Sequence, residues 1–310
     1  MTRHPLVLLA LACASAAGAF AVWLAAFHLP GGRGLDGRAL QTFTGVASPP
    51  RGPSIHGIAL LADPLPFTLA AAAIIALALW RRRWLMAAVV PAILLSANVA
   101  TQLLKPALAD SRMFDLRGVV TSYPGSWPSG HSTAAMSLAL CIVLVAGPRW
   151  RSLVALAGGA YAVAVGYALV ALGFHLPSDV LGGFLVAATF MLLGAAALAA
   201  LEARMPARAP GAEPSLLSAP SLAAFASALL AVAALAVVWR EPRAPADALE
   251  HPVALLAAIG IAGLGLALTT GLAHVLRAET RGCVEFVRLS RTNSTHPPVR
   301  RRRRASPPRA

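Results

Sequence analysis

Long apolar stretches separated by short polar ones dominate the sequence. A membrane-spanning helix needs about 17–25 mostly apolar residues to cross roughly 30 Å of hydrocarbon. Stretches of about that length run approximately over Leu6–Leu29, Asp63–Trp80, Leu85–Leu104, His131–Ala146, Leu153–Phe174, Asp179–Leu201, Leu222–Val238 and Val253–Leu276. The short alternating segments typical of an outer-membrane barrel do not occur. The pattern therefore predicts an all-α, polytopic membrane protein whose spans satisfy their backbone groups as helices.

The composition agrees with folding in lipid. Of the 310 residues, 58% are hydrophobic and 12% are charged, and the mean hydropathy is +0.70. The first apolar stretch resembles a signal peptide, but it continues to Leu29, beyond the length of a signal core, so we predict a retained span. The three cysteines have neither CxxC nor metal-ligand spacing, and we interpret all of them as inert: Cys13, Cys141 and Cys283.

Basic residues are distributed unevenly between the two sides that alternating spans would create. One side carries 18 of the 26 lysines and arginines, including Arg81–Arg83 and a C-terminal run of arginines. The positive-inside rule then places both termini in the cytoplasm. The segments facing outward would be the loops Pro30–Ala62, Lys105–Gly130 and Phe174–Ser178, with a shorter loop around Arg240–Pro252.

The chain divides into three parts by composition. Residues 1–205 are predicted to form the membrane core, and residues 206–276 to add two further transmembrane helices. Residues 277–310 are predicted to be a basic, disordered cytoplasmic tail, with five consecutive arginines at Arg300–Arg304. Such a run on a soluble protein would suggest nucleic acid. Because this one follows a membrane helix, we expect anionic lipid headgroups as its partner and no nucleic acid.

Polar residues gather in one stretch on the predicted outer side. Lys105 and Arg112 supply two cations seven residues apart, which suits a phosphate, although an interfacial pair of lipid-facing side chains is the alternative. Ser129-Gly130-His131 lies where a loop enters a helix, and the free N–H groups at a helix N-terminus favour an anion. On its own, this tripeptide is equally a helix cap with a nearby histidine.

His175 and Asp179 lie four residues apart at the start of a predicted span. On a helix they share a face, so the carboxylate can bond one imidazole nitrogen and leave the other as a nucleophile. Together with His131 and the two cations, they favour a phosphoryl-transfer site. One histidine would attack phosphorus, the second would protonate the departing oxygen, and no metal or other cofactor would be needed.

Three motifs in this stretch resemble those of the type 2 phosphatidic acid phosphatase superfamily. Its first motif, K-x6-R-P, is matched from Lys105 to Arg112, with Met113 in place of the proline. The second, P-S-G-H, is intact at Pro128–His131. The third, S-R-x5-H-x3-D, is matched at its histidine and aspartate, but Ala168-Leu169 replaces its Ser-Arg pair. The resemblance covers roughly residues 60–200.

The resemblance implies a fold and a role for each matching residue. The core would be a six-helix bundle, with the two further C-terminal helices added to it. His175 would be the nucleophile, Asp179 would orient it and His131 would be the general acid. The family's third-motif arginine is missing here, and Arg117, in the same outward loop as Arg112, is a candidate to replace it. The substrate phosphate would be bound by Lys105, Arg112, Ser129 and Gly130.

The sequence leaves the activity open within limits. The leading hypothesis is a metal-independent phosphatase acting at the outer face of the cell membrane on a polyprenyl diphosphate, phosphatidic acid or a related lipid phosphate. A lipid-linked phosphotransferase would use the same residues. A lipid-binding protein with impaired catalysis is favoured by the loss of the arginine at Leu169. A transporter is disfavoured, because the charges gather at one predicted face and not at the membrane midplane.

Overall fold

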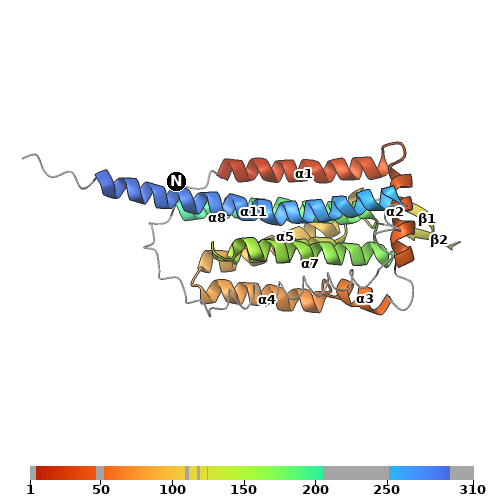
Figure 1. Ribbon diagram of the computed structural model, residues 1–310, viewed down its shortest axis with the longest axis horizontal. Helices are drawn as coiled ribbons and strands as arrows, with labels where there is room; N and C mark the ends of the chain where they lie inside the picture. The colour runs from red at the N-terminus through yellow and green to blue at the C-terminus, as the bar shows by residue number, and fades with distance from the viewer. Residues whose placement is uncertain are drawn as a thin grey trace, which may run out of the picture.

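A computed structural model describes residues 5–46, 52–108, 112–116, 119–123, 125–204 and 251–293. Most of its helices run side by side along the long axis (Figure 1). The elements, in chain order, are α1 (Pro5–Phe27), α2 (Gly32–Val46), α3 (Gly52–Leu60), α4 (Pro64–Trp80), α5 (Trp84–Leu108), β1 (Arg112–Leu116), β2 (Val119–Tyr123), α6 (Gly130–Val145), α7 (Arg151–Ala171), α8 (Pro177–Ala203) and α11 (Pro252–Asn293).

The structure confirms a multi-pass, helical membrane protein. In the described part of the chain, five helical segments are long and apolar enough to cross a membrane: α1, α5, α7, α8 and the Pro252–Leu276 part of α11. The predicted span at Asp63–Trp80 is one half of a bent pair, in which Pro53–Leu60 and Pro64–Trp80 meet at 47°. We attribute the break to Pro64, because a proline at a helix start has no N–H to continue the preceding helix. The predicted span Leu222–Val238 lies outside the described residues.

The helix α6 differs from the other predicted spans. It has 16 residues, so its length is about 24 Å, less than the roughly 30 Å of a hydrocarbon core. Its residues are nevertheless almost all buried, because α5, α7, α8 and α11 pack against it. A helix that is apolar on every side is as typical of burial in protein as of contact with lipid. In this fold it belongs to the centre of the bundle.

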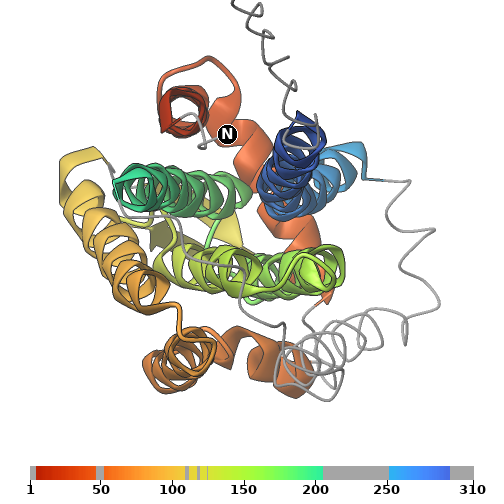
Figure 2. The same ribbon diagram turned by 90° about the vertical axis from the view of Figure 1, so that its left-hand side faces the viewer.

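Two of the predicted outward loops are structured. The segment predicted as the loop Pro30–Ala62 contains α2 and α3, and the segment Lys105–Gly130 contains the antiparallel pair β1–β2. The helix α2 lies across one end of the bundle (Figures 1 and 2). It buries Asp36, Ala39 and Leu40 on one face, at the spacing of an amphipathic helix. An apolar helix face this short is a weaker sequence signal than a continuous apolar stretch, so α2 was predicted as part of a loop.

Arginines bind helix ends at the opposite end of the bundle. Arg81 donates to the carbonyl of Val145 (3.1 Å), and Arg151 donates to the carbonyl of Ala146 (3.1 Å). The carbonyl end of a helix attracts cations, so these contacts stabilise the C-terminus of α6. The N-terminus of α6, which carries the second motif, lies at the other end of the helix. The fold therefore separates the motif from these arginines by the length of α6.

The final helix is longer than expected. The predicted boundary between the last span and a disordered tail falls at residue 276, but α11 continues to Asn293. The prediction for residues 277–293 is therefore corrected to helix. The sequence there is compatible with a helix that extends beyond the apolar region, because straight-chain residues such as arginine have good helix propensity. Residues 294–310, with Arg300–Arg304, lie outside the described residues.

Candidate active site

The second motif forms the N-terminus of α6. Ser129 is the N-cap, and its side-chain oxygen accepts a hydrogen bond from the backbone N–H of Ser132 (3.3 Å). Its carbonyl accepts from the N–H of Thr133 (3.0 Å). Gly130 and His131 follow as the first two residues of the helix. The local sequence thus builds a capped helix start whose remaining N–H groups are available to an anion.

The third motif is joined directly to this helix start. The backbone N–H of Ser129 donates to the carbonyl of Asp179 (3.0 Å), which lies in the first turn of α8. Two glycines permit this approach. A Cβ on Gly182 would lie 2.5 Å from Nε1 of Trp127, and a Cβ on Gly183 would lie 2.7 Å from the carbonyl oxygen of Ser129. These distances are too short for any side chain, so the paired glycines bring α6 and α8 together at the motifs.

His175 and Asp179 make the contact that their spacing predicts. Nδ1 of His175 lies 3.3 Å from one carboxylate oxygen of Asp179, which also accepts the N–H of Leu176 (3.1 Å). The Asp179 side chain is fully buried, and that of His175 is 12% exposed. An ionised carboxylate only accepts, so Nδ1 carries the proton and Nε2 keeps a free lone pair. This tautomer is the one a nucleophilic imidazole needs.

Arg112 lies in the interior and not in an open phosphate site. One terminal nitrogen donates to Asp36 (3.0 Å) and to the hydroxyl of Ser178 (3.0 Å). The other donates to the hydroxyl of Ser126 (2.9 Å) and to the second carboxylate oxygen of Asp179. The guanidinium is therefore held by four side chains, two of them carboxylates. This placement differs from the phosphate-binding role implied by the first motif.

Asp36 was not identified by the sequence analysis. Its side chain is buried on α2 and accepts both the N–H and the hydroxyl of Ser178 as well as Arg112. Burial raises the pKa of Asp36 from 3.8 to about 6, and the hydrogen bond from Ser178 and the charge of Arg112 act in the opposite direction. Its only sequence signal is an acidic residue in a predicted outer loop of a protein with few charges.

Lys105 lies beside the start of α6. It occupies the last turn of α5 and is partly buried. Its Nζ lies 3.7 Å from the point where a Cβ on Gly130 would be, and Nε2 of Gln102 lies 3.3 Å from that point. Gln102 is three residues before Lys105 and therefore shares its helix face, a signal that the sequence analysis did not use. Together they place a cation and an amide over the α6 N-terminus.

His131 has a carboxylate partner of its own. Its Nε2 lies 3.1 Å from Asp63, and the two side chains are 41% and 39% exposed. Asp63 is the N-cap position of α4, next to the break between α3 and α4. In the sequence, Asp63 marks only the beginning of the predicted span Asp63–Trp80. An acidic residue at the outer end of an apolar stretch is itself a signal of function.

The position of the missing arginine is filled by the core. Leu169 is 1% exposed and Ala168 is 3% exposed, and both belong to the main apolar cluster. The carbonyl of Leu169 accepts the N–H of Phe174 (2.9 Å) and of His175 (3.3 Å), so this part of α7 supports the loop that carries the histidine. An apolar side chain thus occupies the place where the family has a cation. The predicted substitute, Arg117, lies outside the described residues.

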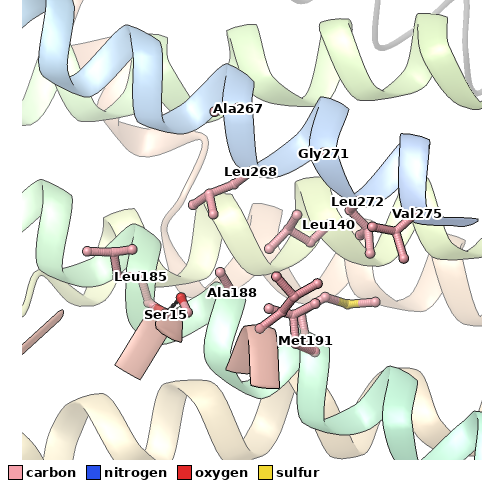
Figure 3. Close-up of a pocket in the computed structure, with 12 residues that line it drawn as sticks. Ser15, Leu140, Leu185, Ala188, Met191, Ala267, Leu268, Gly271, Leu272 and Val275 are labelled. Carbon is pink, nitrogen blue, oxygen red and sulfur yellow. Dashed lines mark hydrogen bonds between the residues drawn. The ribbon is translucent and has the colours of Figure 1, made fainter. Parts of the chain in front are cut away.

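A pocket of about 280 Å³ lies away from these residues, among α1, α6, α8 and α11. Figure 3 shows its mainly aliphatic lining, with Met191 and Leu268 among the side chains that face it. The hydroxyl of Ser15, which also lines it, donates to the carbonyl of Leu185 (3.0 Å). The described residues that line it include no ionisable side chain, so they offer no acid, base or charged nucleophile. In the described part of the chain, no group of three or more His, Cys, Asp or Glu side chains is placed to hold a metal ion.

A comparison with known protein families agrees with the three motifs. Residues 93–204 match the model of the PAP2 superfamily. The matched region runs from within α5 to the end of α8 and includes all three motifs, but neither Asp36 nor Asp63. A crystal structure described as the first transmembrane PAP2 type phosphatidylglycerolphosphate phosphatase from Bacillus subtilis is similar to this chain, with 20% sequence identity and a TM-score of 0.49. The similarity covers 65% of this chain and 97% of that one. No curated protein matches the chain.

Proposed function

Because residues 93–204 match the model of the PAP2 superfamily, we propose that the chain is a PAP2-type membrane phosphatase, which hydrolyses a lipid phosphate or diphosphate through a phosphohistidine on His175. The observation that supports this most directly is the His175–Asp179 pair, because the buried carboxylate fixes Nδ1–H and leaves Nε2 free. A phosphatidic acid, a polyprenyl diphosphate or a related lipid would present its phosphate at the membrane end where these residues lie.

The first half of the proposed reaction transfers the phosphoryl group to the enzyme. Nε2 of His175 attacks phosphorus with its lone pair, the new N–P bond forms, and the P–O bond to the lipid breaks. The departing oxygen takes a proton from His131. Asp179 stabilises the positive charge that develops on the phosphorylated imidazole, because it already accepts the hydrogen bond from Nδ1. Lys105 and the N–H groups at the start of α6 would bind the phosphoryl oxygens.

The second half returns the enzyme to its starting state. A water molecule gives a proton to the now neutral His131, its oxygen attacks phosphorus, the N–P bond breaks, and inorganic phosphate leaves. His131 can exchange protons with water because its side chain is 41% exposed. The site is at the end of the bundle opposite Arg81–Arg83, so the positive-inside rule supports an outer-face location.

A catalytically impaired lipid-binding protein is the second candidate. It is favoured by two observations: Leu169 is buried in the apolar core, and the terminal nitrogens of Arg112 are engaged by side chains. Removing one charged donor from a site of this kind commonly costs about a hundredfold to a thousandfold in rate. Lys105, without a neighbouring arginine, would then stabilise the phosphoryl group too weakly for rapid turnover.

The test is phosphate release by the detergent-purified chain from a panel of lipid phosphates and diphosphates with a divalent-metal chelator present. We expect release from at least one lipid and its loss in His175→Ala and His131→Ala. His274→Ala is the matched control, because His274 is exposed on α11 and lies outside the motifs. Activity that requires a divalent metal, or that survives in His175→Ala, would contradict the proposal. Lipid binding with no release from any lipid would support the second candidate.

A further inference from the structure

The helix α2 contributes a charged side chain to the interior of the site from outside the matched region. Asp36 is 8% exposed, and its carboxylate accepts hydrogen bonds from Arg112 on β1 and from Ser178 on α8. It therefore connects α2, β1 and α8 at one point. Because α2 and β1 lie at the end of the bundle and not within it (Figure 1), this contact ties that end to the third motif.

The contacts form a chain of charges that ends at the nucleophile. Asp36 binds Arg112, Arg112 binds Asp179, and Asp179 binds the imidazole of His175. The Asp36, Arg112 and Asp179 side chains are each less than a tenth exposed, so solvent screens their charges only weakly. A buried guanidinium beside Asp179 alone would offset most of that carboxylate's charge.

We propose that Asp36 is a positioning residue of the phosphatase, which holds Arg112 and offsets its charge so that Asp179 remains an effective counter-ion for His175. This inference rests on the proposed function, because it assumes that His175 is the nucleophile. Asp36 touches neither the substrate nor the reacting nitrogen. It acts through Arg112, and through Ser178, whose N–H it also binds at the start of α8.

The same contacts allow a different arrangement, which makes a different kinetic prediction. If Arg112 were a phosphate ligand that Asp36 merely restrains, removal of the Asp36 charge would release it toward the substrate. Phosphate binding would then become tighter and KM would fall. In the proposed arrangement, KM stays nearly constant, since Arg112 remains in the interior with Asp179, and kcat falls because the charge that develops on His175 is less well stabilised.

The experiment compares Asp36→Asn, Asp36→Glu and Arg38→Gln with the wild type, using kcat and KM for the best lipid substrate. Mutation of the outer-shell partners of metal ligands typically costs about 10–100-fold in affinity or activity, and we take the same scale for Asp36. We expect a fall in kcat of that size in Asp36→Asn, with KM changed less than about threefold, and partial recovery in Asp36→Glu. Arg38 is exposed on the same helix, so Arg38→Gln should match the wild type.

A double variant shows whether Asp36 acts through Arg112. In an Arg112→Gln background, the further change Asp36→Asn should lower kcat much less than it does alone, because the partner is already gone. Equal losses in both backgrounds would overturn the proposal, as would an unchanged kcat or a lower KM in Asp36→Asn.

If Asp36→Asn does not fold, Ser178→Ala keeps every charge and should lower kcat moderately at constant KM. An unchanged kcat in Ser178→Ala would equally overturn the proposal. Failure of the proposed function itself would appear separately, as retained activity in His175→Ala.

Discussion

The two histidines of the site lie in contrasting surroundings. The carboxylate partner of His175 is fully buried, and it also binds a backbone N–H and an arginine. The carboxylate partner of His131 is 39% exposed and lies 3.1 Å from the ring. One histidine is therefore held by a network of charges in the interior, and the other by a pair at the surface.

The contrast matches what each residue would do in the proposed reaction. A nucleophile benefits from a fixed tautomer and a preorganised counter-ion, and both are strongest where water is excluded. An acid that must be reprotonated in each turnover benefits from access to water. Exposed ion pairs contribute only about 0–1 kcal/mol, so the His131 pair adjusts orientation more than stability. Substitutions at the buried His175–Asp179 pair should therefore lower activity more than substitutions at the exposed His131–Asp63 pair.

The largest effect is expected at the buried carboxylate. Asp179→Asn keeps the shape but presents an amide that can offer its N–H to the imidazole, which favours the wrong tautomer, and it leaves Arg112 with one carboxylate in place of two. The equivalent change in a Ser-His-Asp triad lowers kcat by about 10⁴. We expect a loss on the order of 10³ or more in phosphate release. A loss below about tenfold would show that the buried pair is not central to catalysis.

The next effect concerns the packing that joins the motifs. A Cβ on Gly183 would lie 2.7 Å from the carbonyl oxygen of Ser129, so Gly183→Ala must push α6 and α8 apart. Overpacking of this kind costs about 1–3 kcal/mol. We expect a lower apparent unfolding temperature in detergent and reduced activity. Gly263→Ala is the matched control, because no described atom lies within 4 Å of its added Cβ. Equal unfolding temperatures and equal activities in the two variants would contradict the close approach of α6 and α8.

The pH dependence separates activity from stability at Asp36. Its pKa is raised from 3.8 to about 6, so the folded protein takes up this proton more readily than the unfolded chain. The resulting contribution to stability is fully present below about pH 4 and is lost as pH rises through about 6. Activity should change in the opposite direction, because only the ionised carboxylate offsets Arg112.

Compared with the wild type, Asp36→Asn should therefore show a weaker pH dependence of both activity and stability. The fall of kcat below about pH 6 should become weaker, and the unfolding temperature should depend less on pH between about 4 and 6. The charged groups that face Asp36 from neighbouring elements are Arg112 and Asp179. Both proteins share the ionisations of His131 and His175, so the difference between their profiles isolates Asp36. Identical pH profiles for the wild type and Asp36→Asn would contradict the role proposed for Asp36.

The smallest effect is expected at the exposed pair. Asp63→Asn removes the charge but can keep a hydrogen bond to His131, and both side chains are well exposed. We expect a loss of activity of less than about tenfold and a change in stability below about 1 kcal/mol. A loss of activity as large as that in Asp179→Asn would contradict the proposed difference between the exposed His131–Asp63 pair and the buried His175–Asp179 pair.

The sequence predicted the parts of this molecule that depend on local spacing. Apolar length predicted α1, α5, α7 and α8 nearly to their ends, because burial in lipid needs a continuous run. The four-residue spacing of His175 and Asp179 predicted their contact, although His175 lies in the loop before α8 and not on the helix. The order of the three motifs predicted the similarity to this family, and residues 93–204 match the model of the PAP2 superfamily.

Long-range contacts between polar residues were not predictable in the same way. Asp36 and Arg112 are 76 residues apart, and Asp63 and His131 are 68 residues apart, so no local periodicity joins them. The helix α2 was missed because its apolar face is short. The role expected for Arg112 followed from its motif, whereas its surroundings were set by α2.

Trapping of the intermediate tests most directly whether phosphate passes through His175. The purified chain would be mixed with a lipid phosphate carrying a labelled phosphoryl group, with chelator present, and quenched under alkaline denaturing conditions that preserve phosphohistidine. Peptide mass spectrometry would then locate the label. We predict label on His175 in wild type, and none on any histidine in His175→Ala. Phosphate release without label on His175, or label on His131 in its place, would contradict a phosphohistidine mechanism at His175.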